Sequence, residues 1–336
     1  MRSQARVAIY HSRASQTYAA ATATRAEQAT CFRAAYRVLL ESRIPFDFVS
    51  DRRMSDADVA EQLSRYDVIV MPNVACLSTA EAAALDAFVA RGGTLIASGE
   101  TGLYDERGQR RDGFALESFP ARNISLCVDK LKTYVRVAEH ELHFPKTRLL
   151  HLDGWYFYVE AKEDAAGQLS LLPPQRYGPP ELCFPDVADN ESPGILRRRH
   201  GRGQAIYLPW LPEWIYYRDG LPEHRELIAQ LVLESAPLPV KVEGIGPVEV
   251  TIHRRAAGRG GYLIHLVNYS GQRNNVFEQP VPLRGFKIGV KGARGPARSL
   301  IGGQAIAVAA PDVDGYAWME IPEIGTFQAI LAEATA

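Results

Sequence analysis

Residues 92–112 read GGTLIASGETGLYDERGQRRD, and this stretch decides how the first part of the chain folds. Residues 94–97 are a short apolar run between two glycines and the pair Ser98-Gly99, which is typical of a buried strand that ends in a tight turn. The two glycines also end a preceding helical segment, because glycine readily adopts the left-handed backbone found at helix ends. A helix, a buried strand and a glycine-rich turn in this order indicate one unit of an α/β sheet.

The same rhythm extends on both sides of this stretch. Short apolar runs predict further strands at residues 7–10, 46–49, 67–71 and 204–208. Helices are predicted at residues 24–43, 55–63, 78–91 and 222–235, and Ser78 with Glu81 forms a capping box at the start of the third. Strands that alternate with helices predict right-handed parallel crossovers. The predicted fold class is therefore α/β, with an open parallel sheet that helices flank on both faces.

Residues 120–195 break this rhythm and are rich in aromatic residues and proline. We interpret them as a mostly β or irregular insertion that folds out of the first domain as a cap. Residues 236–239 (APLP) form a linker, and beyond it apolar residues recur with period two between turns rich in glycine and proline. The prediction is an α/β domain at residues 1–236, with its insertion at about 120–195, and a C-terminal antiparallel β-sandwich at residues 237–336.

Three stretches carry a family resemblance: YDVIVMPNVACL at 66–77, the stretch at 92–112, and GRGQAIYLPW at 201–210 with the helix after it. Together they resemble the trimerisation domain of family-42 β-galactosidases, and most nearly the matching region of uncharacterised glycoside-hydrolase-like proteins. The segment YLIHLVNYSG at 262–271 resembles the small β domain that follows there. The resemblance implies a class I glutamine amidotransferase-like (flavodoxin-like) α/β domain and a homo-oligomer, with a trimer favoured.

In the family-42 enzymes a (β/α)₈ barrel with paired catalytic carboxylates precedes these domains. Such a barrel needs roughly 250 residues, and the strands predicted here begin at residue 7, so we expect no barrel in this sequence. Three arrangements stay open: a fragment, a subunit that works with a separate glycosidase barrel, or a stand-alone relative.

The resemblance also directs attention to the turn after the strand at 94–97. Amidotransferases of this fold carry a cysteine there, within Gly-x-Cys-x-Gly, whereas residues 97–102 read ASGETG and place Glu100 or Thr101 at that point. A carboxylate cannot replace an activated thiolate in attack on an amide. We therefore assign no catalytic residue, and Glu100 is the one candidate. We favour a structural role for Glu100, as a cap of the turn. The alternative is that it acts as a general base or binds a sugar.

Ligands of open α/β sheets gather beyond the carboxyl ends of the strands. Aromatic side chains beside a carboxylate suit stacking on a sugar. The same side chains also suit a subunit interface or a core, and we favour this second interpretation. The ligand-binding candidates are His11, Asn73, Glu100, Thr101, Trp210, Glu213, Trp214 and Tyr217. If the strands have the expected order, one crevice would be lined by His11, Asn73, Trp210, Glu213, Trp214, Tyr216 and Tyr217.

Composition excludes several classes of partner. The net charge of −1 gives no reason to expect nucleic acid or an anionic membrane, and no run of 18 apolar residues exists. The four cysteines form no CxxC pair, which suits a reducing, cytoplasmic location, and Cys76 is expected to be buried or in a loop. His200 and His224 are expected to be surface or capping residues, since neither has a second ligand at metal-binding spacing. We predict no cofactor and no metal.

The sequence therefore predicts a non-catalytic oligomerisation or accessory module of a β-galactosidase-like glycoside hydrolase. The alternative is a stand-alone carbohydrate-active hydrolase or a sugar-binding protein that uses a crevice around Glu100 and Trp210. Were the chain an enzyme, the expected class would be glycoside hydrolase.

Overall fold

The computed structural model describes residues 1–22, 30–54, 58–138, 142–144, 146–174, 178–179, 192–255, 260–273 and 276–334. Contacts between residues divide the chain into two compact units. The α/β unit comprises Ala8–Val38 and Phe48–Ser235, and the β unit comprises Met1–Val7, Leu39–Asp47 and Ala236–Ala336. In the described residues no helix is long and apolar enough to cross a membrane.

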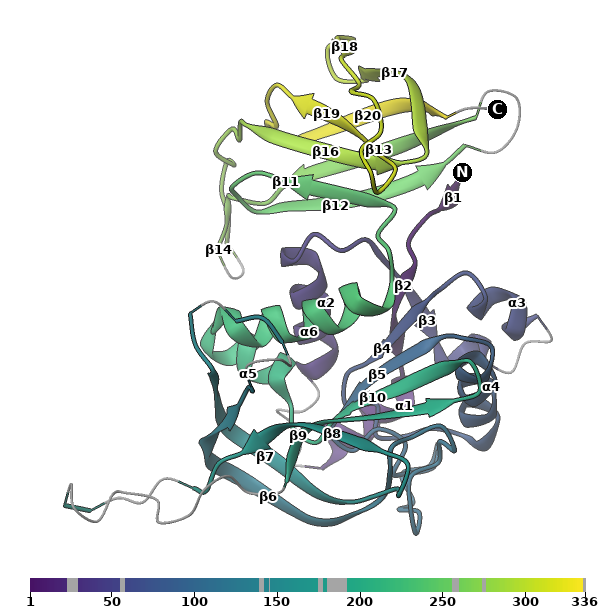
Figure 1. The fold of residues 1–336 in the computed structure, drawn as a ribbon, viewed down its shortest axis with the longest axis vertical. Helices are drawn as coiled ribbons and strands as arrows, with labels where there is room; N and C mark the ends of the chain where they lie inside the picture. Colours follow the sequence, from purple (N-terminus) through teal and green to yellow (C-terminus); the bar gives the residue numbers. More distant parts are fainter. Residues whose placement is uncertain are drawn as a thin grey trace. The chain divides into compact units, whose positions relative to one another are not determined.

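A nine-stranded mixed sheet forms the centre of the α/β unit, in the order β3-β2-β4-β5-β10-β9-β8-β6-β7 (Figure 1). The pairs β4–β5 and β5–β10 are parallel, as predicted. From β10 outward to β7 every neighbouring pair is antiparallel. The strands are β2 (Val7–His11), β3 (Phe46–Ser50), β4 (Val68–Met71), β5 (Thr94–Ser98), β6 (Ala121–Arg136), β7 (Leu149–Ala161), β8 (Ala166–Leu171), β9 (Pro193–His200) and β10 (Gly203–Leu208).

The described residues of the region at 120–195 are mostly in strands, but the placement of this region as a cap outside the domain is wrong. Strands β6 to β9 continue the central sheet itself. The connection is a tight turn at Gly201, whose φ of 59° lets β9 fold back onto β10. An entirely parallel sheet was also wrong, since the outer part is antiparallel. The backbone groups on the outer side of β10 thus find partners in β9, which keeps the sheet growing.

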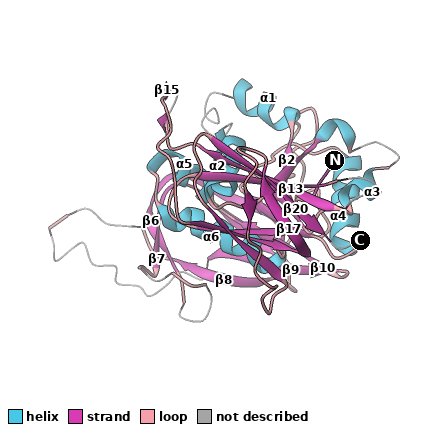
Figure 2. Ribbon diagram, turned by 90° about the horizontal axis from the view of Figure 1, so that it is seen from above, coloured by secondary structure: helices cyan, strands magenta, loops and turns pink. Residues whose placement is uncertain are grey.

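The helices are α1 (Arg13–Ala21), α2 (Cys31–Glu41), α3 (Val59–Leu63), α4 (Thr79–Ala90), α5 (Pro212–Asp219) and α6 (Pro222–Ser235), drawn in cyan in Figure 2. The capping box of Ser78 and Glu81 is present at α4, as predicted. The predicted starts of α2 and α3, at residues 24 and 55, lie outside the described residues. Helices α1 and α5 were not predicted. On one face of the sheet, α4 packs on alternate residues of the strands in a single buried cluster.

The β unit has two antiparallel sheets, β1-β12-β13-β20-β17-β18 and β11-β16-β19, whose residues share one buried apolar cluster. The N-terminal strand β1 pairs with β12, which the sequence did not indicate because two residues carry no periodicity. The strands are β1 (Arg2–Ser3), β11 (Val240–Glu243), β12 (Val248–Arg254), β13 (Gly261–Asn268), β16 (Phe286–Lys291), β17 (Ala293–Ser299), β18 (Ala305–Ile306), β19 (Tyr316–Ile321) and β20 (Phe327–Ala334), with a separate hairpin of β14 (Gln272–Arg273) and β15 (Val276–Phe277).

Candidate functional site

The turn that follows β5 is held by buried side chains rather than left open. The Ser98 hydroxyl donates to Glu213 Oε1 at 2.5 Å and accepts from the backbone N–H of Asn73 at 3.0 Å. The Asn73 side-chain oxygen in turn accepts from the backbone N–H of Glu100 at 2.8 Å. Asn73 has a φ of 46°, a left-handed conformation that asparagine tolerates better than most residues. These bonds tie the ends of β4 and β5 to the start of α5.

Glu100 and Thr101 stand where the sequence comparison with amidotransferases would place a cysteine, and both are buried. Glu100 is only 3% exposed and accepts a hydrogen bond from the Tyr104 hydroxyl at 3.2 Å. The Thr101 hydroxyl donates to the Ser98 carbonyl at 2.7 Å and accepts from the Val74 N–H at 3.0 Å. Their polar groups therefore serve the turn itself.

The backbone of this turn is tightly packed at Gly99. Gly99 has a φ of +61°, and a Cβ placed on it would lie 2.3 Å from Asn73 Oδ1 and 2.7 Å from Leu211 Cδ2. A side chain at position 99 would therefore collide with protein atoms. The hydrogen bonds and this packing fix the conformation of the turn.

Glu213 lies in the first turn of α5 and is 2% exposed. Burial raises the pKa of Glu213 to about 7, and hydrogen bonds from Ser98, its own backbone N–H and Cys31 oppose that rise. Burial, and then the nearby Glu213 carboxyl, also raise the pKa of the Cys31 thiol well above its ordinary value. Cys31 is therefore a protonated donor to Glu213 rather than a nucleophilic thiolate.

The two tryptophan candidates are buried in the core, one of the placements that we favoured over sugar stacking. Trp210 is fully buried, with its indole N–H donating to the Gly194 carbonyl at 2.9 Å. Trp214 is buried against Trp155, their ring centroids 4.8 Å apart. Neither tryptophan presents a face on which a sugar could stack. The sequence could not show this, because their partners lie on other strands.

Two candidates lie partly at the surface. The His11 ring contacts the Phe32 ring edge to face at 4.8 Å, and Tyr217 lies beneath the guanidinium of Arg33 at 6.0 Å. The expectation for His224 was wrong: it is buried, and its Nε2 lies 2.7 Å from the His151 carbonyl oxygen. Burial accordingly lowers the pKa of His224.

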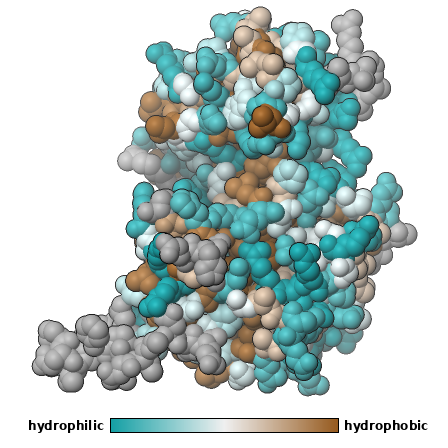
Figure 3. Space-filling model, viewed as in Figure 1, coloured by the Kyte–Doolittle hydropathy of each residue, from teal (hydrophilic) through white to brown (hydrophobic). Residues whose placement is uncertain are grey.

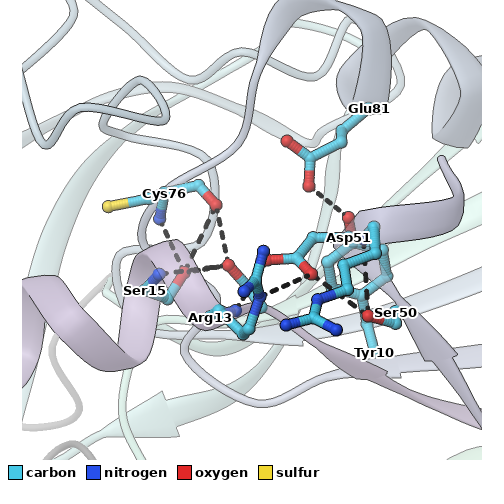
Figure 4. Close-up of polar contacts among 9 residues, drawn as sticks. Tyr10, Arg13, Ser15, Ser50, Asp51, Cys76 and Glu81 are labelled. Carbon is cyan, nitrogen blue, oxygen red and sulfur yellow. Dashed lines mark hydrogen bonds and ion pairs between the residues drawn. The ribbon is translucent and has the colours of Figure 1, made fainter. Parts of the chain in front are cut away.

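A second polar cluster lies at the end of β2 (Figure 4). The Ser15 hydroxyl donates to Ser12 Oγ at 2.9 Å and accepts from the Cys76 backbone N–H at 2.9 Å. The Tyr10 hydroxyl donates to Glu81, which also accepts from the Ser78 backbone N–H at 2.6 Å. The sequence identified the capping role of Glu81 but gave no signal for its contact with a tyrosine 71 positions away.

A small cavity adjoins this cluster, bordered by Tyr10, Ser12, Ser15, Asn73 and other residues. Its volume is about 30 Å³, which suits a water molecule or two and is far below the roughly 300 Å³ of a typical ligand pocket. Cys76 is buried, as expected. Among the described residues, no group of three or more His, Cys, Asp or Glu side chains could hold a metal ion.

The observation that decides the family is a sequence match. Residues 5–161, which contain β2 to β7 and both polar clusters apart from Glu213, match the family model described as the beta-galactosidase trimerisation domain. These residues belong to that domain family. No curated protein matches the chain.

Solved structures show the same fold across the trimerisation domain and the β unit. An alpha-L-fucosidase isoenzyme 2 from Paenibacillus thiaminolyticus has a TM-score of 0.69 at 18% identity, over 99% of this chain and 49% of that one. A catalytic mutant of a GH42 beta-galactosidase from G. stearothermophilus has a TM-score of 0.66 at 17% identity, over 99% and 41%. A beta-galactosidase from Bacillus circulans sp. alkalophilus gives 0.65 at 18%, over 99% and 42%. This chain thus spans less than half the length of each.

Proposed function

We propose that this chain is a non-catalytic assembly module of a β-galactosidase-like glycoside hydrolase. The observation that carries the proposal is the match of residues 5–161 to a domain family described by trimerisation. The similar fold of the galactosidases and the fucosidase, over almost the whole chain, supports a role beside a sugar-cleaving domain.

The filled turn after β5 supports the absence of chemistry. A glycosidase needs two carboxylates that reach opposite sides of a sugar. Glu100 and Glu213 are the carboxylates nearest this turn, and both are buried with hydrogen-bond donors from the protein. Because both side chains are buried, neither presents its carboxylate to a ligand that arrives from solvent.

The proposal includes a homo-trimer and a glycosidase barrel, encoded separately or in the same protein, whose sugar site this module would wall. It also includes a cytoplasmic location, supported by cysteines without a pairing pattern. A carbohydrate ligand is part of the rival function, which would need an open aromatic platform. On the coloured part of the face in Figure 3, apolar residues are scattered among hydrophilic ones.

Light scattering on the purified chain tests the assembly role. A trimer has three times the 37.1 kDa mass of one chain, and we expect that mass. If the well-folded chain is monomeric, the proposed role in assembly is wrong. A panel of chromogenic glycosides tests the rival: hydrolysis by the wild type that is lost in Glu100→Gln would establish an enzyme instead.

A further inference from the structure

We infer that one copy of this chain binds the next through a surface formed by helix α2 and the edge strand β3. We call it the α2–β3 surface and define it by Arg33, Tyr36, Arg37 and Phe48. The inference rests on the proposed assembly function and adds the location of the contact. All four residues lie in the α/β unit and within the part of the chain that matches the trimerisation domain.

Two large aromatic side chains stand at the centre of this surface. Phe48 is 52% exposed and Tyr36 is 36% exposed. Their rings stack with an interplanar angle of 14° and centroids 6.3 Å apart. Behind them the Phe32 ring lies 5.6 Å from Phe48 and 4.8 Å from His11. The exposed rings therefore rest on an ordered aromatic base, which lowers the entropy that binding would cost.

Arginines border the aromatic centre. Arg33, Tyr36 and Arg37 are exposed and stand three and four positions apart on α2, so they share one face of the helix. Arg33 extends this face to Tyr217, whose ring lies beneath its guanidinium. Tyrosine, phenylalanine and arginine are the residues enriched in interface centres and binding hot spots, whereas surfaces that only meet water favour lysine and glutamate.

The position of β3 favours an intermolecular role. It stands at the end of the nine-stranded sheet, beside β2. Proteins usually protect an edge strand with charge or proline, because an apolar edge promotes association. The strand β3, FDFVS, does carry one charge, at Asp47, whose carboxylate accepts a hydrogen bond from Ser3, but its middle residue Phe48 is an exposed phenylalanine. An exposed phenylalanine on an edge strand, in a domain family described by trimerisation, fits an association that the protein uses.

The occupant is a second copy of this chain rather than another protein, because the family description names self-association for these residues. A closed ring of three copies needs a head-to-tail contact. The α2–β3 surface therefore meets a different surface of the neighbouring copy and does not pair with itself. A two-fold contact between two β3 strands would instead give a dimer.

Sedimentation equilibrium of the full chain tests the location, with Phe48→Lys and Tyr36→Glu as variants. The Phe48 and Tyr36 side chains are already partly exposed to water, so the folded chain can accept charged side chains at both positions. Circular dichroism checks that both variants are folded. Phe277→Lys is the matched control, because Phe277 is 77% exposed but lies on β15, outside the matched residues. We expect each variant to weaken assembly at least tenfold and the control to leave it unchanged.

The outcomes separate the two ideas. A trimeric wild type whose assembly neither variant weakens overturns the α2–β3 surface and leaves the proposed function standing. A wild type that is monomeric at every concentration overturns the proposed function and the surface together. A stable wild-type dimer overturns the head-to-tail contact. Folded, monomeric Phe48→Lys and Tyr36→Glu beside a trimeric Phe277→Lys would establish the surface.

Discussion

The buried carboxyl of Glu213 makes the stability of the α/β unit depend on pH. Its pKa is about 7 in the folded chain, against an ordinary value of 4.5. Between these two values the folded state binds a proton that the unfolded state has lost. The free energy of unfolding therefore falls as the pH rises through this window and becomes constant above it. A difference of about 2.5 between the two pKa values corresponds to roughly 3 kcal/mol.

Glu213→Gln removes this dependence, because an amide carries no charge at any pH. Its side-chain oxygen can still accept the hydrogen bond that Ser98 gives to Glu213 Oε1. We expect the variant to match the wild type near pH 4.5, within about 1 kcal/mol for the altered hydrogen bond. At pH 8 it should be more stable by about 2 kcal/mol, after the same allowance.

The assay is urea unfolding of both proteins at a series of pH values, followed by tryptophan fluorescence. Trp155, Trp210 and Trp214 all lie in the α/β unit, so the signal reports mainly on that unit. Glu106→Gln is the control, since Glu106 is exposed and should shift neither curve. A stability difference between wild type and Glu213→Gln that stays constant from acid to alkaline pH would refute the assignment.

Three further changes test other parts of the account. Gly99→Ala should destabilise the α/β unit by about 3 kcal/mol, because the added Cβ would collide with Asn73 and Leu211 at a positive φ. Gly220→Ala is the control and should cost about 1 kcal/mol, because Gly220 also has a positive φ but nothing lies within 4 Å of its Cβ position. Equal losses of stability in thermal unfolding would disprove the tight packing at Gly99. Arg43→Met should destabilise the β unit by about 2 kcal/mol, since the variant loses the hydrogen bonds from Arg43 to the carbonyls of Val242, Gly244 and Gly246. Arg284→Met is the control and should change stability little, because it breaks a surface ion pair. Glu100→Gln should leave the behaviour toward chromogenic glycosides unchanged, and a loss of turnover relative to wild type would reopen the catalytic interpretation.

The sequence predicted the parts of the fold that local patterns encode. The apolar runs that became β4, β5 and β10 are short and bounded by turn residues, so each strand could be placed to within a residue or two. The capping box at Ser78 is equally local. Residues 120–195 show the limit: their β character was visible, but pairing partners depend on long-range contacts that periodicity does not report.

The candidate site shows the same limit more sharply. Glu213 follows Pro212 at a helix start, a place where an acidic residue is usually exposed to water. Its burial depends on Ser98, 115 positions earlier, and on Cys31. For Trp210 the sequence left a stacking platform open beside the favoured interface or core role, and it gave no sign that the indole N–H donates to the Gly194 carbonyl on another strand. The missing thiol at the turn after β5 was legible in the sequence, whereas the hydrogen bonds that fill this turn were not.

Sedimentation equilibrium of the unmodified chain, over a wide range of concentrations, tests the central claim most directly. Assembly predicts that the mass rises toward three times 37.1 kDa as the concentration increases. A folded chain that keeps the mass of one copy at every concentration would contradict the account.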